Sequence, residues 1–78
     1  MKYLEEIDIG ECFCFDKKIY ILTEDFKRNG DKKCVDLKDG NQRWISSSSI
    51  IEIVDIYTLD KDSTISPIRE RKNEYKTN

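Results

Sequence analysis

The pair Arg43-Trp44 combines the residue types best suited to binding a planar anion. An indole offers a flat surface on which a base can stack, and a guanidinium can hold a phosphate or carboxylate through two hydrogen bonds. Because side chains alternate along a strand, only one of Trp44 and Ile45 can face the interior. We expect Trp44 to lie in the core and Arg43 in solvent. If Ile45 is the core residue instead, Trp44 is exposed and belongs to a binding or oligomer surface.

A second group of candidates is a run of four cations within seven residues, which follows Phe26 and consists of Lys27, Arg28, Lys32 and Lys33. Such a loop can hold a phosphate through side-chain and backbone donors, while Phe26 stacks on a base. The alternative is a solvated run whose charge is balanced by Glu24, Asp25 and Asp31. The candidate ligand-binding residues are therefore Phe26, Lys27, Arg28, Arg43 and Trp44.

The residues needed for the common forms of catalysis are missing or out of context. The chain contains no His, which excludes Ser-His-Asp and Cys-His activation as well as His-ligated metals. The segment 60–64 resembles the nucleophile motif of haloacid-dehalogenase-type phosphatases, but that motif requires a doubly wound sheet that 78 residues cannot build. As a calcium loop it fails because Ile65 stands where Gly is required. The four hydroxyls of Ser46–Ser49 have no nearby base other than carboxylates or Lys, and no Gly-rich loop accompanies them. We therefore expect no enzyme activity, and no cofactor or metal.

The three cysteines indicate a reducing compartment. Cys12, Cys14 and Cys34 are an odd number, and we expect free thiols in a cytoplasmic setting. Cys12 and Cys14 would point to the same face of a strand, where they are poorly placed to pair with each other. Their spacing also lacks the usual two-residue spacer of a zinc site. We expect all three to behave as small buried or half-buried apolar residues.

Size and charge narrow the remaining function classes. Seventy-eight residues make one domain, of which 38% are charged and 37% hydrophobic. Fourteen basic and sixteen acidic residues give a net charge of −2, which argues against a general polyanion binder but leaves a local basic patch open. The apolar runs are short, so we expect neither a membrane span nor a signal-peptide core.

The elements that must position these residues are five short strands, at residues 12–15, 19–23, 32–37, 42–45 and 50–57. A polar turn at 16–18 and a charged loop at 24–30 separate the first three. Asp39-Gly40 predicts a hairpin with a primed turn, and Ser46–Ser49 predicts a tight turn or one turn of 3₁₀ helix. Residues 1–9 form a lead-in compatible with one helical turn or an irregular arm.

Residues after the fifth strand form an extension. Leu59 and Ile65 flank an acidic turn, which predicts a second hairpin. Ser66-Pro67 is typical of a helix start and predicts a short helix, with a frayed, solvated tail as the alternative. The predicted organisation is a barrel with an N-terminal arm over residues 1–57 and an extension over residues 58–78, made of a hairpin plus a short helix or flexible tail.

The order of the turns resembles that of an SH3-like barrel. Over residues 4–57 the chain is similar to small phage-encoded proteins of this fold, in a pattern of Leu4, Ile7, Gly10, Phe13, Tyr20, Trp44 and Ile53. The resemblance implies an all-β chain with a small five-stranded SH3-like barrel. It carries over no functional residue, because the fold serves many functions. Small phage proteins often counter host defence by sequestration or blocking, so the resemblance also implies a place in the host cytoplasm.

Three functions from different classes follow. The first is a non-enzymatic binding protein that sequesters a small anionic, nucleotide-like ligand, at a site between subunits because the barrel has little interior space. The second is an interaction module that inhibits a host protein by direct docking through a strand edge and an aromatic patch. The third is a nucleic-acid-binding barrel. We also expect a homo-oligomer, because the fifth strand and segment 58–66 offer edges that need protection.

Overall fold

The computed structural model describes residues 1–67, which form two antiparallel sheets and contain no α-helix. The all-β fold class predicted from the sequence is confirmed. A single turn of 3₁₀ helix, η1 (Leu4–Glu6), follows the first strand. The strands are β1 (Lys2–Tyr3), β2 (Cys12–Phe15), β3 (Lys18–Phe26), β4 (Lys32–Asp36), β5 (Gln42–Ile45), β6 (Ile50–Ile53), β7 (Tyr57–Leu59) and β8 (Ile65–Pro67). No helix in these residues has the length and apolar character that a membrane crossing requires.

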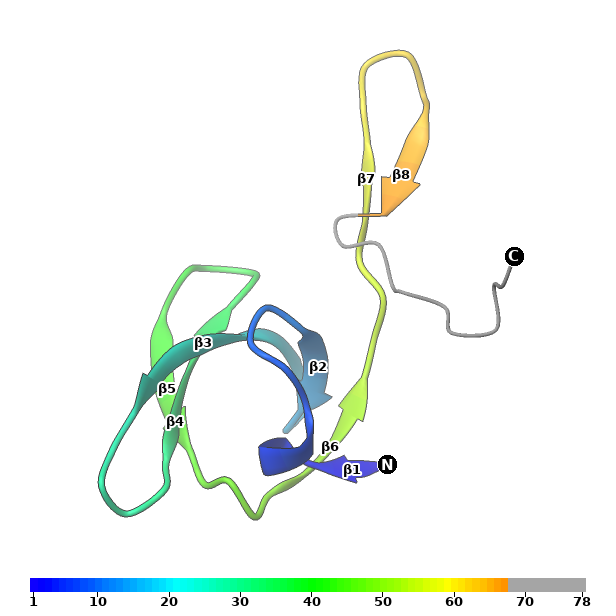
Figure 1. Cartoon of the computed structure of the whole chain (residues 1–78). Helices are drawn as coiled ribbons and strands as arrows, with labels where there is room; N and C mark the ends of the chain where they lie inside the picture. Colours follow the sequence, from blue (N-terminus) through cyan, green and yellow to red (C-terminus); the bar gives the residue numbers. More distant parts are fainter. Residues whose placement is uncertain (68–78) are drawn as a thin grey trace.

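The main sheet has six strands in the order β1-β6-β2-β3-β4-β5. The five predicted strands are β2 to β6, and the sheet they form curls into the rounded outline of a small barrel (Figure 1). The longest strand, β3, pairs with both β2 and β4, and its register with β4 shifts between Leu22 and Phe26. Such an irregularity bends a strand, so β3 can serve both halves of the barrel.

The N-terminal arm closes the barrel at the segment that joins β5 to β6. The backbone N–H of Leu4 donates to the Ser49 carbonyl at 2.9 Å, and that of Glu5 donates to the Ser47 carbonyl at 3.0 Å. The side chain of Leu4 is fully buried, and β1 pairs with β6. The lead-in therefore contains the helical turn that was one of its two predicted forms, together with a short strand that the sequence did not predict.

The core lies on the concave face of the main sheet. The rings of Phe13 and Tyr20 stack at its centre, with centroids 5.8 Å apart. The buried cluster consists of Leu4, Ile7, Phe13, Tyr20, Leu22, Cys34, Ile45 and Ile51. Among the described residues, Asp36 is the one polar residue that is buried with this cluster. Its Oδ1 accepts a hydrogen bond from the Lys38 backbone N–H at 2.8 Å. Capping this backbone N–H satisfies the carboxylate at the start of the β4–β5 loop.

Two strand boundaries differ from the prediction by more than one residue. The second predicted strand continues to Phe26, so residues 24–26, predicted as loop, belong to β3. The strand predicted over residues 50–57 ends at Ile53, because its partner β2 begins at Cys12. The Val54 backbone still donates to the Cys12 carbonyl, but at Gly10, with φ of +91°, the chain turns away and leaves no further partner.

The turns follow local sequence signals in position but not always in type. The β4–β5 hairpin is closed by a four-residue loop, residues 37–40, in which Gly40 has φ of +79° and Asp39 does not have positive φ. The predicted primed turn at Asp39-Gly40 is therefore wrong. Two consecutive left-handed residues, as a type I′ turn requires, occur instead at Asp16 (+55°) and Lys17 (+62°) between β2 and β3. The serine run forms the predicted tight turn, closed by the Ser49 N–H on the Ser46 carbonyl.

The second sheet is the predicted C-terminal hairpin, in which Leu59 pairs with Ile65 across a turn at residues 60–64. It projects away from the barrel (Figure 1), and each residue from Tyr57 to Pro67 is exposed. Ser66 and Pro67, predicted to begin a short helix, belong instead to strand β8, because they pair with Thr58 and Tyr57. The helix or tail predicted after them lies outside the described residues.

The three cysteines are not joined in disulfides, and Cys12 and Cys34 are buried while Cys14 is half-buried, as expected. Burial raises the pKa of the Cys34 thiol to about 11, and the nearby charges of Lys32 and Arg43 reduce that rise only in part. The buried thiol is therefore protonated at neutral pH, and it acts as a small apolar core residue.

This raised pKa predicts that Cys34 stabilises the fold less in alkaline solution. Well below the ordinary thiol pKa of 9.0 the thiol is protonated in both states, whereas between that value and the native pKa of about 11 only the unfolded chain gives up the proton. The contribution to stability is thus complete at pH 7.5 and is lost as pH rises through 11. The unfolding free energies of wild type and Cys34→Ala should converge by roughly 2 kcal/mol between pH 7.5 and 10.5. A constant difference in urea denaturation would contradict this.

Candidate functional site

Trp44 lies on the outer surface of the barrel. Paired residues of adjacent strands share a face, and neighbours along a strand alternate. Ile45 is buried, with 3% of its surface exposed, whereas 39% of Trp44 is exposed. The expectation that Trp44 fills the core is therefore wrong, and the alternative with Ile45 inside is correct. The cause lies in β4, where Cys34 and Asp36 face the core and Val35 faces outward.

Two ammonium groups lie beside the Trp44 ring. Lys27 Nζ is 4.7 Å and Lys33 Nζ is 5.4 Å from the ring centroid. Lys33 is directly opposite Trp44 in the β4–β5 pair, and its ammonium forms an ion pair with Asp25 at 3.3 Å. We call this cluster of Asp25, Lys27, Lys33 and Trp44 the Trp44 face. It presents an exposed aromatic ring beside cations, which is a combination that can bind a planar anion.

The position of Lys27 is set by the turn that joins β3 to β4. The Lys27 backbone donates to the Asp31 carbonyl at 2.8 Å and accepts from the Gly30 N–H at 2.9 Å. Gly30 has φ of +96°, and Asn29 Oδ1 accepts from the Asp31 backbone, as the Asn-Gly signal predicts. Arg28 lies exposed within this turn. The loop thus anchors the backbone of Lys27 and leaves its side chain to reach the indole.

Phe26 belongs to the opposite face of the sheet. It pairs with Lys32, which in turn pairs with the buried Ile45, and its ring is 70% exposed. The ammonium of Lys32 lies 5.9 Å from the Phe26 ring centroid. The two aromatic side chains predicted to share a site are therefore on different sides of the molecule.

Arg43 is also separated from Trp44. Its Nη1 donates to the Tyr20 hydroxyl at 2.9 Å and to Asp16 Oδ2 at 3.3 Å. The guanidinium lies 5.2 Å from the centroid of the Phe15 ring. The hydrogen bond with Tyr20, followed by that with Asp16, raises the pKa of Arg43 further above its ordinary value. Arg43 thus joins β5 to the β2–β3 turn, on the face opposite Trp44.

Replacing Arg43 by alanine is expected to lower the unfolding free energy by about 1 kcal/mol, because a charged hydrogen bond and the packing on Phe15 are lost together. The matched control is Asp16→Asn, which removes only an exposed ion pair, tolerates the left-handed backbone and should cost less than about 0.5 kcal/mol. Urea denaturation measures both. Equal stability of Arg43→Ala and wild type would show that these contacts contribute nothing.

Of the five predicted site residues, the structure brings Lys27 and Trp44 together. It adds Lys33 and Asp25, which the sequence reasoning did not include in the site. Lys33 belongs to the cation run, but its contact with Trp44 depends on the register of β4 with β5, which the local sequence does not reveal. Within residues 1–67 no three Cys, Asp or Glu side chains gather as ligands for a metal ion.

The chain has no significant match among protein-family models, curated proteins or solved structures. Its function is therefore inferred from the geometry of the Trp44 face.

Proposed function

We propose that this chain is a non-enzymatic binding protein that sequesters a small anionic, nucleotide-like ligand on the Trp44 face. The observation that carries the proposal is the exposed indole with two ammonium groups 4.7 and 5.4 Å from its centroid. A nucleobase stacks on an aromatic side chain with a gain of about 1–3 kcal/mol, and an ammonium attracts the attached phosphate. A ligand that has both groups uses both features of this surface.

The charge of the Trp44 face favours a ligand with few phosphates. The carboxylate of Asp25 offsets the charge of Lys33, with which it is paired at 3.3 Å. Lys27 has no ion pair within the described residues, so its ammonium is free to leave the ring and bind a phosphate when a base stacks there. A monophosphate or a single phosphodiester group matches this balance better than a triphosphate does.

The placement of the aromatic residues favours a small ligand over a nucleic-acid strand. Strand-binding surfaces offer successive stacking platforms along a basic groove. Here Phe26 lies on the opposite face from Trp44, and the chain has a net charge of −2. If the chain is phage-encoded, as its resemblance to phage barrels implies, sequestration would withdraw a nucleotide signal from host defence.

Thermal unfolding with and without ligand tests the proposal. The purified chain is heated with cyclic di- and oligonucleotides, with ADP-ribose-type compounds, and with short DNA and RNA. A ligand present at a hundred times its Kd adds about 2.7 kcal/mol, which raises the Tm of a domain of this size by roughly 10 °C or more. We expect such a shift from one small nucleotide, and we expect it to persist at 0.5 M salt. A shift from nucleic acid alone that disappears with salt would overturn the proposal.

The free edge of β5 favours protein docking as a second candidate. β5 is an edge strand of the main sheet and carries Trp44 on its outer side. An exposed edge can accept an added strand from another protein, with the aromatic ring as an anchor. If no nucleotide shifts the Tm, this inhibitor function becomes the better explanation, and substituting Pro for Gln42 at the edge should abolish capture of the target.

A further inference from the structure

The C-terminal hairpin has apolar side chains but no surface of its own to bury them. Tyr57, Leu59 and Ile65 are 57%, 67% and 68% exposed, and no backbone pairing joins β7 or β8 to the main sheet within the described residues. An isolated two-stranded hairpin is marginally stable in water. This hairpin therefore needs a partner that covers its apolar side chains.

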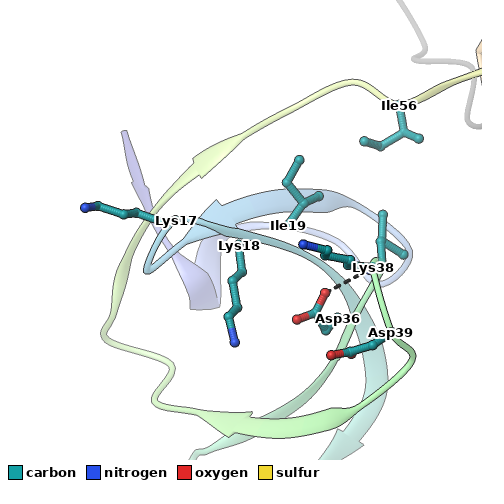
Figure 2. A pocket seen from close by; sticks show the side chains of 8 residues that line it. Lys17, Lys18, Ile19, Asp36, Lys38, Asp39 and Ile56 are labelled. Atoms are coloured by element: carbon teal, nitrogen blue, oxygen red, sulfur yellow. Dashed lines mark hydrogen bonds between the residues drawn. The ribbon is translucent and has the colours of Figure 1, made fainter.

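A groove on the barrel has the complementary composition. It has a volume of about 820 Å³, and its apolar floor is formed by Ile19 and Leu37, 37% and 43% exposed, together with Ile56. Figure 2 shows Ile19 extending toward the linker that carries Ile56, with Lys38 beside it. The groove is also lined by Lys17 and Lys18 from the β2–β3 hairpin.

The groove has a small positive net charge. None of Lys17, Lys18 and Lys38 has an ion pair among the described residues. Asp36 accepts the Lys38 N–H and Asp39 accepts the Asn41 N–H at 2.9 Å, and with these two carboxylates the lining has a formal net charge of +1. The groove therefore suits a partner with an apolar body and an acidic end.

We infer that the occupant of this groove is the hairpin of a second copy of the chain. The hairpin carries apolar side chains along both strands, and Asp60, Lys61 and Asp62 give its tip a formal net charge of −1. These match the apolar floor and the three lysines of the groove. The hairpin of the same chain cannot easily fill this groove. It begins next to Ile56 and projects away from the barrel (Figure 1), so its tip points away from the groove.

A second copy of the chain can cover the hairpin and fill the groove at the same time. In a two-fold dimer each chain supplies one hairpin and one groove, so the same contact forms twice and no unpaired hairpin remains. The contact would bury the apolar side chains that are otherwise exposed on the hairpin and the groove. The groove and the hairpin share no residue with the Trp44 face, so the dimer does not depend on the proposed ligand.

Sedimentation equilibrium of the full chain with charge-reversed variants tests the inference. Asp62→Lys reverses an acidic group of the tip, and Lys38→Glu reverses a cation of the groove. Asp60 is left intact because its Oδ1 caps the backbone of Asp62 and Thr64. Each single variant should weaken the dimer by about tenfold or more, since every substitution acts at both symmetric contacts. Lys2→Glu, an exposed charge on β1, is the matched control and should leave the dimer Kd unchanged.

The double variant Asp62→Lys with Lys38→Glu should restore most of the affinity, because the pair is then reversed in sign. Misfolding cannot produce such a rescue. A wild-type chain that remains monomeric up to 500 μM would overturn the inference. It would indicate that another protein covers the apolar side chains of the hairpin. A dimer that ignores both single variants, or a double variant weaker than either, would also overturn it.

Discussion

Replacing Trp44 by alanine is expected to weaken binding of the nucleotide-like ligand by roughly 10- to 100-fold. The substitution removes the stacking platform, which is worth about 1–3 kcal/mol for one base. The effect on stability should be small, because Trp44 lies on an edge strand and is 39% exposed. Isothermal titration calorimetry at two salt concentrations measures the loss, and the Tm of the unliganded variant confirms that it is folded.

The matched control for this prediction is Phe26→Ala. It also removes an exposed aromatic ring, but from the opposite face of the sheet, and it should leave affinity unchanged. Trp44→Phe keeps a smaller ring in place and should retain most of the binding energy. If Trp44→Ala and Phe26→Ala lower the ligand affinity equally, the site spans both faces of the sheet. If Trp44→Ala binds the ligand as tightly as wild type, the Trp44 face is not the binding site.

The second large effect concerns the core. Phe13→Ala is expected to lower the unfolding free energy by about 3–5 kcal/mol, because it leaves a cavity beneath a fully buried ring that stacks on Tyr20. A domain of this size has a total stability of only about 4–12 kcal/mol. The variant should therefore lose a large part of its stability, with a Tm at least roughly 12 °C below that of wild type.

Chemical denaturation followed by Trp44 fluorescence provides the measurement for the core prediction. Ile50→Ala is the matched control, since Ile50 is 56% exposed and precedes the buried Ile51 on the same strand. It should cost less than about 1 kcal/mol. A Phe13→Ala variant as stable as Ile50→Ala would show that the barrel repacks around the missing ring.

The positions of the strands could be predicted from the sequence because their signals are local. Apolar residues of β2 to β6 lie between polar turns, and Gly30 and Gly40 adopt the positive φ that their turns require. The ends of the strands could not be predicted in the same way. β6 ends at Ile53 because β2 offers no partner beyond Cys12. The end of β6 is therefore set by the length of its partner strand, which the apolar residues after Ile53 do not reveal.

The candidate site was only partly predictable for a related reason. Both faces of β4 carry apolar side chains, Cys34 on one and Val35 on the other, so the pattern does not reveal which face is inside. Once Cys34 faces the core, Trp44 must lie outside and Arg43 must point toward Tyr20. The contacts of Arg43 join residues far apart in the chain, and the local sequence does not predict them.

The closure of the barrel by its first residues also determines when the protein can fold. The backbone bonds from Leu4 and Glu5 reach the segment that precedes β6, so the part of the barrel that is synthesised first must wait for nearly its last part. Contacts between such distant residues slow folding, because the loop between them must be ordered before any contact is gained. The barrel is therefore expected to assemble after translation in one cooperative step, and a chain truncated before Ile50 should remain unfolded and open to proteolysis.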